Sequence, residues 1–202
     1  MSNDYYNYQK YIDDLTSVLS VGYFYKYNNE TIQQRIINSK YFQVINNEIL
    51  PSEAYLTTDE ILSDIYFDSE INELTENIYY RELEWVSTSY INVVKNTSLN
   101  FETIFLYAPI SEMEVMFKLY HEMDFNKLLK WFNECRSKTS LISIRMKQLK
   151  ITSNELASES GLSCSMINSL RSRKRDIKKL DVEHALKLAK ALNIAVETLL
   201  NN

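Results

Sequence analysis

Apolar residues recur at three- and four-residue steps along most of this chain, which is the period of an amphipathic helix. The longest N-terminal examples lie at 4–20 and 78–95, and shorter ones lie at 30–38, 58–67, 112–123 and 125–136. Residues with short polar side chains precede several of these segments. They predict helix N-caps at Thr58 or Asp59, at Ser111 and at Asp124.

Three stretches of the same region leave the choice between helix and strand open. Residues 23–27 alternate weakly and fit a strand or an extended loop. Residues 41–50 either continue a helix or form a short strand, and residues 101–110 fit a buried strand or a helical turn. Gly22 is a candidate for the end of the first helix, and Pro51 breaks the pattern. The sequence therefore predicts a mainly α N-terminal region with little sheet.

Composition changes abruptly after residue 138. All 15 tyrosines, 8 phenylalanines and 2 tryptophans lie at or before Phe132. Residues 1–138 carry 21 acidic and 11 basic side chains, whereas residues 139–202 carry 6 acidic and 11 basic ones. The net charge of −5 thus combines an acidic part of −10 with a basic part of +5. We predict two domains, an acidic, aromatic-rich one at 1–138 and a basic one at 139–202.

The stretch KITSNELASESGLSCSMINSLRSRKRDI, residues 150–177, predicts two short helices joined by a sharp turn. Thr152 and Glu155 form a T-x-x-E capping box, in which each side chain bonds the backbone N–H of the other residue. Gly161 follows at a position where a positive φ ends a helix at no steric cost. Ser163 then caps the second helix.

The outward face of that second helix is a strip of short polar side chains. It consists of Cys164, Ser165, Asn168, Ser169 and Ser172, and the basic run RSRKR at 171–175 follows, with Lys178 and Lys179 close behind. Two short helices with a tight turn, the second polar outside and followed by cations, have the arrangement that places a recognition helix in the DNA major groove. The alternative interpretation is a solvated basic loop on a helical protein.

Three further helices complete the expected C-terminal core. Ile142, Met146 and Leu149 give the first of them an inward face, and VETLL near the end of the chain supplies the last. Asp181 caps the helix between these, for which we expect an inward face of Val182, Ala185, Leu186, Ala189 and Leu192. Five short helices would then close one small core.

ITSNELASESGLSCSMINSL, followed by KKLDVEHALKLAKALNIAVETLL, resembles the helix-turn-helix domain of phage-repressor (Cro-like) and xenobiotic-response-element-type bacterial regulators. The resemblance covers roughly residues 140–202 and says nothing of residues 1–138. It implies a five-helix, lambda-repressor-like domain that binds double-stranded DNA. Its specificity comes from the order in which several matching segments follow one another.

The resemblance also implies which residues contact DNA. The positions that read bases in this family are matched here by Ser163, Cys164, Ser165, Asn168 and Ser169, and Ser153 matches a position that helps to hold a phosphate. The basic run beside the recognition helix adds further expected phosphate contacts, at Arg171, Ser172, Arg173, Lys174, Arg175 and Lys178. The family often has an acidic residue where this chain has Arg171, and a glycine where it has Arg173.

These features favour a sequence-specific transcriptional regulator of bacterial or phage type, such as a repressor. One five-helix module buries little surface, so we expect a homodimer on an inverted repeat, with residues 1–138 serving dimerisation, sensing or partner binding. The alternative is a mobile-element protein whose acidic, tyrosine-rich part binds a protein partner. It would act as a host-defence inhibitor or an antitoxin does, and its helix-turn-helix would regulate its own promoter.

Other classes of protein find little support in the sequence. With glycines only at positions 22 and 161, no phosphate-binding G-x-G-x-x-G motif or P-loop is present. His121 lacks the second histidine of a metal-binding helix, and Cys135 and Cys164 are isolated in sequence. No run approaches the about 18 apolar residues of a membrane helix. We therefore expect a cytoplasmic protein that is not an enzyme and has no cofactor, no metal and no membrane contact.

Overall fold

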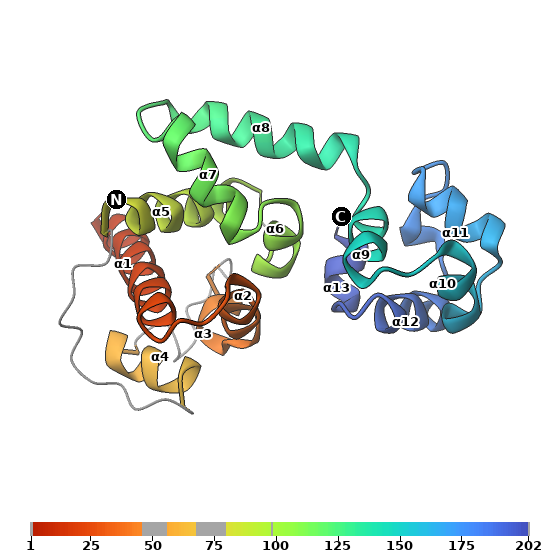
Figure 1. Cartoon of the computed structure of the whole chain (residues 1–202), viewed down its shortest axis with the longest axis horizontal. Helices are drawn as coiled ribbons and strands as arrows, with labels where there is room; N and C mark the ends of the chain where they lie inside the picture. The colour runs from red at the N-terminus through yellow and green to blue at the C-terminus, as the bar shows by residue number, and fades with distance from the viewer. Residues whose placement is uncertain (1, 46–55, 68–79, 98, 202) are drawn as a thin grey trace. The chain divides into compact units, whose positions relative to one another are not determined.

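The computed structural model describes residues 2–45, 56–67, 80–97 and 99–201, and within these ranges it contains thirteen α-helices and no strand (Figure 1). The prediction of a mainly α protein is confirmed. The chain divides into two compact units, Met1–Leu128 and Leu129–Asn202. This division falls inside a helix, whereas composition changes at residue 138. None of the described helices is long and apolar enough to cross a membrane.

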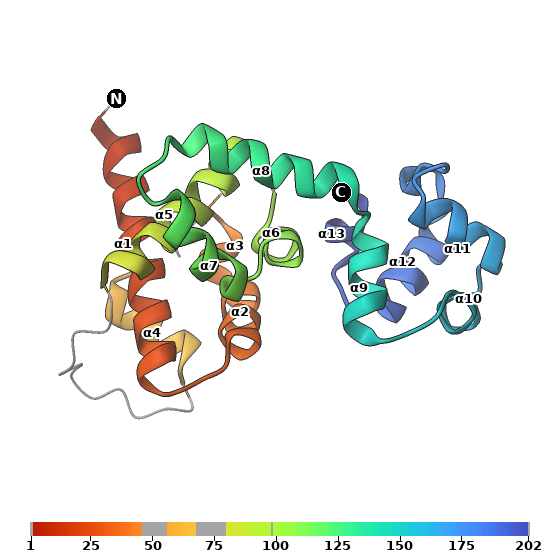
Figure 2. The same ribbon diagram turned by 45° about the horizontal axis from the view of Figure 1, so that its top comes forward.

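The N-terminal unit holds seven helices and the start of an eighth. They are α1 (Ser2–Phe24), α2 (Asn29–Asn38), α3 (Lys40–Gln43), α4 (Thr58–Ile65), α5 (Tyr80–Thr97), α6 (Phe101–Tyr107), α7 (Ile110–Tyr120) and α8 (Phe125–Lys138). Figures 1 and 2 show α1 crossing α5, and α1 packs against both α5 and α4. The α1 residues in this core are spaced as the sequence predicts: Tyr11, Ile12, Leu15, Val18 and Leu19 are all buried.

The stretches that were open between helix and strand are helical wherever the structure describes them. Helix α1 continues through Phe24, and residues 101–107 form α6, whose first turn is capped by Asn100 accepting from the N–H of Thr103 at 2.9 Å. Of the segment 41–50, residues up to Gln43 belong to α3. Residues 46–50 and Pro51 lie outside the described residues.

Two predicted helix starts are wrong by one or two residues. Helix α4 is capped by Thr57, not by Thr58 or Asp59, because Thr57 and Glu60 form a reciprocal capping box. The Thr57 N–H donates to the Glu60 carboxylate at 2.7 Å.

Helix α7 begins after Pro109 instead of at Ser111. Proline fixes φ near the value that a helix entry needs, and the first N–H of the helix, from Ile110, donates to the Gln33 side chain at 2.9 Å. A side chain from α2 therefore takes the place of a local cap.

The C-terminal unit contains the five expected helices after the end of α8. They are α9 (Leu141–Leu149), α10 (Ser153–Ser160), α11 (Cys164–Arg171), α12 (Val182–Ala191) and α13 (Val196–Leu200), with a short 3-10 helix, η2 (Ile177–Lys179), between α11 and α12. Their core is aliphatic, and its buried members include Leu141, Ile142, Met146, Leu156, Ile167, Leu170, Leu188, Leu192 and Leu199.

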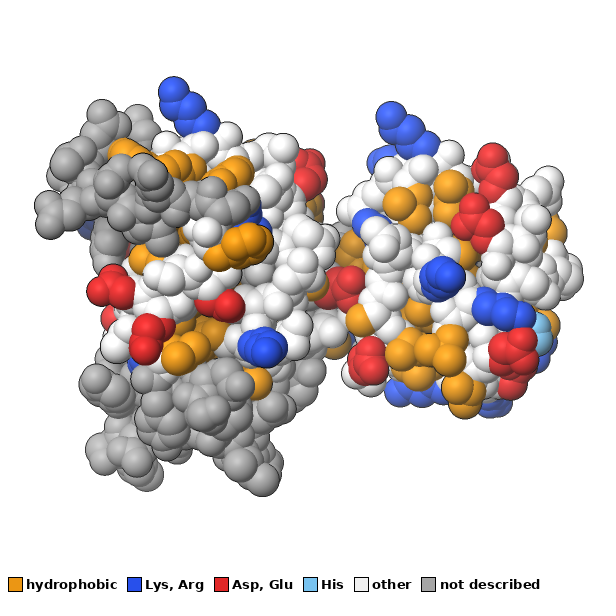
Figure 3. Space-filling view, turned by 90° about the horizontal axis from the view of Figure 1, so that it is seen from below, with side chains coloured by type: hydrophobic (Ala, Val, Ile, Leu, Met, Phe, Trp, Pro, Cys, Tyr) orange, Lys and Arg blue, Asp and Glu red, His pale blue; other side chains and the backbone are white. Residues whose placement is uncertain are grey.

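Two residues expected in this core are on the surface. Val182 is 75% exposed and Leu186 is 50% exposed. The inward stripe of α12 consists of Ala185, Leu188, Ala189 and Leu192. Val182 and Leu186 lie to one side of that stripe, where no other helix covers them. Figure 3 shows hydrophobic side chains reaching the surface of this unit among charged ones.

Gly22 does not end α1 as predicted, since the helix runs two residues further. It is a site of close packing. A Cβ atom at Gly22 would lie 2.6 Å from Tyr66 Oη and 2.7 Å from two atoms of the Ile32 side chain. Tyr66 is held in place because its hydroxyl donates to the Val18 carbonyl at 2.7 Å.

We expect Gly22→Ala to destabilise the N-terminal unit by about 1–2 kcal/mol. Alanine gains roughly 1 kcal/mol of helix preference, but overpacking a buried site costs about 1–3 kcal/mol, and the Tyr66 hydrogen bond is disturbed as well. Urea unfolding followed by Trp85 fluorescence, in a Trp131→Phe background, measures the change. Ser17→Ala, which adds no volume to α1, is the matched control. Equal or greater stability of Gly22→Ala would show that the site has room for a methyl group.

Candidate nucleic-acid interface

Helices α10 and α11 form a helix-turn-helix whose ends are fixed by local side chains. The Thr152 N–H donates to Glu155 at 2.7 Å, and the Glu155 N–H donates back to the Thr152 hydroxyl at 3.2 Å. The bond from the Thr152 backbone, followed by that from its hydroxyl, holds the pKa of Glu155 below its ordinary value. This cap is therefore intact at neutral pH and is lost as the pH falls through the lowered pKa.

The turn between the helices has the predicted geometry. Gly161 adopts a φ of 71°, and Ser163 caps α11 by accepting from the Met166 N–H at 3.1 Å. Leu156 of α10 and Ile167 of α11 have no exposed surface. Because the apolar faces pack inward, the polar face of α11 is turned toward solvent.

The residues predicted to read bases lie together on and before α11. Ser163, Ser165 and Asn168 are exposed, and Cys164 and Ser169 are partly exposed. Two of the hydroxyls are engaged within the helix, since Ser163 is the N-cap and Ser169 donates to the Ser165 carbonyl at 2.9 Å. Asn168 carries the one carboxamide of the strip, and its two functional groups are both directed by neighbours.

A chain of hydrogen bonds links Asn168 to the start of α10. Arg171 Nη1 donates to Ser153 Oγ at 2.7 Å, and Ser153 Oγ donates to Asn168 Oδ1 at 3.0 Å. Asn168 Nδ2 in turn points to Cys164 Sγ at 3.6 Å. The sequence analysis assigned Ser153 and Arg171 to phosphates and missed this link. No local spacing signals it, because the partners are 15 and 18 residues apart.

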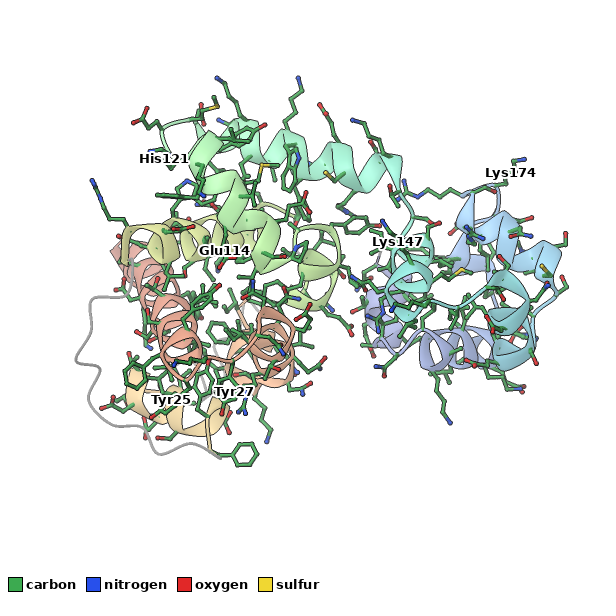
Figure 4. The ribbon with its side chains drawn as sticks, viewed as in Figure 1. Tyr25, Tyr27, Glu114, His121, Lys147 and Lys174 are labelled. Carbon is green, nitrogen blue, oxygen red and sulfur yellow. The ribbon has the colours of Figure 1, made fainter. Side chains whose placement is uncertain are left out.

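Four cations predicted or noted beside the recognition helix face solvent. Lys174, Arg175, Lys178 and Lys179 are all exposed, and among the described residues none of them is paired with a carboxylate. Figure 4 shows the Lys174 side chain pointing away from the body of the unit. Exposed, unpaired cations on a short loop are suited to phosphate oxygens. Ser172, also predicted to contact phosphate, is exposed, and its hydroxyl donates to the Ser169 carbonyl at 3.2 Å.

Arg173, in the same basic run, is held differently. Its guanidinium donates to the carbonyls of Ser137 and Thr139, each at 2.9 Å, and to that of Arg136. These carbonyls lie at the C-terminal end of α8, where a helix carries partial negative charge and unpaired acceptors. Arg173 thus anchors the end of α8 to the segment after the recognition helix.

The backbone of Arg173 explains the glycine that often stands there in the resembling family. Its φ is 55°, in the left-handed region. A residue with a Cβ pays roughly 1–2 kcal/mol for this conformation, whereas glycine does not. In this chain the three hydrogen bonds of the guanidinium offset that cost.

The other candidate groups show no chemistry of their own. His121 lies exposed at the end of α7, with Nδ1 2.8 Å from the Phe117 carbonyl. Trp85 packs edge-on against Phe117, and both tryptophans are partly buried. Within the described ranges no three His, Cys, Asp or Glu side chains are grouped as metal ligands.

A small helical core, a helix-turn-helix and a basic loop after its second helix define a DNA-binding module. Residues 142–201 match the family model of the Cro/C1-type HTH DNA-binding domain, and this part of the chain is such a domain. The resemblance inferred from the sequence is confirmed. No curated protein and no solved structure matches the chain.

We expect Arg173→Gly to leave the salt dependence of DNA binding unchanged, because the Arg173 guanidinium is bound to carbonyls of α8. Lys174→Ala should instead reduce the magnitude of the slope of log K against log salt by about 1 per subunit. Fluorescence anisotropy with a labelled duplex over a series of salt concentrations measures both. A reduced slope for Arg173→Gly as well would identify Arg173 as a phosphate ligand.

Proposed function

We propose that the protein is a sequence-specific transcriptional regulator of bacterial or phage type that binds operator DNA through residues 142–201. The observation that carries the proposal is the outer surface of α11, where uncharged polar side chains are followed by four exposed cations. Hydroxyls and a carboxamide suit base edges in the major groove, and cations suit the flanking phosphates. Nothing in this role requires catalysis, a cofactor or a metal.

The surface chemistry favours moderate direct readout supported by strong electrostatics. Asn168 is the one member of the strip with a side chain that can pair bidentately with a base. Phosphate contacts position a protein on DNA but carry no sequence information. Operator recognition would therefore depend on a small number of base contacts repeated in two half-sites.

We expect the purified chain to bind duplex DNA with a slope of log K against log salt of roughly −4 per subunit. The four exposed cations would each displace about one condensed counterion. Anisotropy titrations at increasing salt give the slope, and substituting alanine at all four positions is the matched variant. A slope near zero for the unaltered chain would rule out the proposed interface.

Dimerisation is a second element of the proposal, and α7 offers a surface for it. Val115 and Leu119 are adjacent on one face of α7 and are 60% and 62% exposed. Glu112 and Lys118 stand three residues before and after Val115 and are both exposed. If two copies of α7 crossed antiparallel at Val115, each Glu112 would meet the Lys118 of the other copy. A twofold pair needs this self-complementarity.

We expect Val115→Glu combined with Leu119→Glu to convert a dimer into a monomer, because like charges would replace the apolar contact. Sedimentation velocity on the full chain measures the change. Footprinting should show two protected half-sites for the unaltered protein and loss of that joint protection for the variant. Glu102→Ala, on α6, is the control and should stay dimeric. An unaltered protein that is monomeric in solution and on DNA would contradict dimerisation and leave the α7 surface for a different protein, as the partner-binding alternative requires.

A further inference from the structure

The hydrogen-bonded chain through Ser153, here called the α10–α11 relay, consists of Arg171, Ser153, Asn168 and Cys164. We infer that Ser153 and Arg171 are specificity-determining residues: they hold the Asn168 carboxamide in one of its two orientations, so that α11 distinguishes an A·T pair from the reversed T·A pair. This inference rests on the proposed binding of operator DNA and deepens it.

The direction of the relay follows from what each group is able to donate. An arginine guanidinium is a donor only, so the oxygen of Ser153 must accept from Arg171 Nη1 at 2.7 Å. The single hydroxyl hydrogen of Ser153 then has to find an acceptor. Asn168 lies 3.0 Å away, and only its carbonyl oxygen can accept. The Asn168 oxygen therefore faces α10.

The other half of the carboxamide is fixed by the same constraint. With Oδ1 facing Ser153, Nδ2 must point the opposite way, and it lies 3.6 Å from Cys164 Sγ, a weak acceptor. A rotation of the amide by half a turn would place an NH₂ group against the Ser153 hydroxyl hydrogen and carbonyl oxygen against the sulfur. Both contacts would be lost, so the two orientations differ in free energy.

The orientation matters for readout because adenine presents an ordered pair of groups in the major groove. A carboxamide reads adenine by accepting from N6–H through its oxygen and donating to N7 through its nitrogen. Ser153 uses one of the two lone pairs of Oδ1, and Cys164 uses one of the two hydrogens on Nδ2, so one acceptor site and one donor remain for the base. Reversing the amide reverses the order of donor and acceptor along the groove. A relay that fixes one order therefore selects one direction of the A·T pair.

The exposure of the groups agrees with this role. Asn168 is exposed, whereas Ser153 and Arg171 are partly buried beside it. Within the described part of the chain, Arg171 Nε is a buried donor with no hydrogen-bond partner. The Arg171 side chain is thus committed to the interior side of the relay, and Asn168 is the member that can meet a base.

The experiment selects bound sites from a library of random duplexes with the full-length protein and then compares affinities for A·T and T·A duplexes at the position that Asn168 reads. The unaltered chain should prefer adenine in one direction at one position of each half-site. Ser153→Ala should reduce the A·T over T·A preference about tenfold, and Ser153→Thr, which keeps the hydroxyl, should retain it. Arg171→Met tests the other end of the relay and should reduce the preference as Ser153→Ala does.

Two further measurements separate orientation from folding and from DNA binding itself. Ser158→Ala, an exposed serine on the same helix, is the matched control and should leave base preference unchanged. Binding to nonspecific duplex at low salt should be the same for Ser153→Ala and the unaltered chain, because phosphate contacts are untouched. An A·T over T·A preference that survives in Ser153→Ala, or is absent from the unaltered chain, would overturn the inference while leaving the proposed function intact. Failure of the unaltered chain to bind any duplex at low salt would overturn both.

Discussion

Unpaired backbone groups at the ends of short helices are the constraint on which the C-terminal unit depends. Its five α-helices have 9, 8, 8, 10 and 5 residues, lengths at which a helix is not stable alone in water. Four of them begin with a side-chain cap, at Ser140, Thr152, Ser163 and Asp181. The fifth, α13, has no such cap and depends on burial of Thr198 and Leu199. Capping and packing together fix the orientation of the recognition helix.

The residue after the recognition helix meets two demands at once. The turn requires a left-handed backbone, and the end of α8 requires donors for its last carbonyls. Glycine satisfies only the first demand, whereas Arg173 satisfies both at a conformational cost. The carbonyls that it binds belong to residues 136, 137 and 139, which precede the matched family domain at 142–201. The end of α8 is therefore an extension of the domain in this chain.

The DNA-facing surface separates affinity from readout. Lys174, Arg175 and the lysines of η2 are exposed and unpaired within the described residues, so they are free to bind phosphates. The readout strip carries hydroxyls, a thiol and one carboxamide, and most of its hydroxyls are already used by the helix. Recognition then depends less on the number of polar groups than on how firmly Asn168 is oriented, because a carboxamide that rotates freely reads both directions of a base pair.

The sequence by itself determined the features whose partners are local. The capping box at Thr152, the turn at Gly161 and the caps at Ser163 and Asp181 involve groups within three or four residues of each other, so spacing and residue type were sufficient. The family resemblance added the five-helix fold and the identity of the recognition helix. The abrupt change in composition indicated two parts, although the compact units divide inside α8.

Only the tertiary structure decided the contacts between residues far apart in sequence. Gln33 replaces a local cap for α7 over a separation of 77 residues, and Arg173 reaches 34 to 37 residues back to the end of α8. The α10–α11 relay and the exposure of Val182 also depend on which helices pack together. Helical periodicity reports the direction of a side chain around its own axis, but its partner is set by packing against other helices, for which local spacing holds no information.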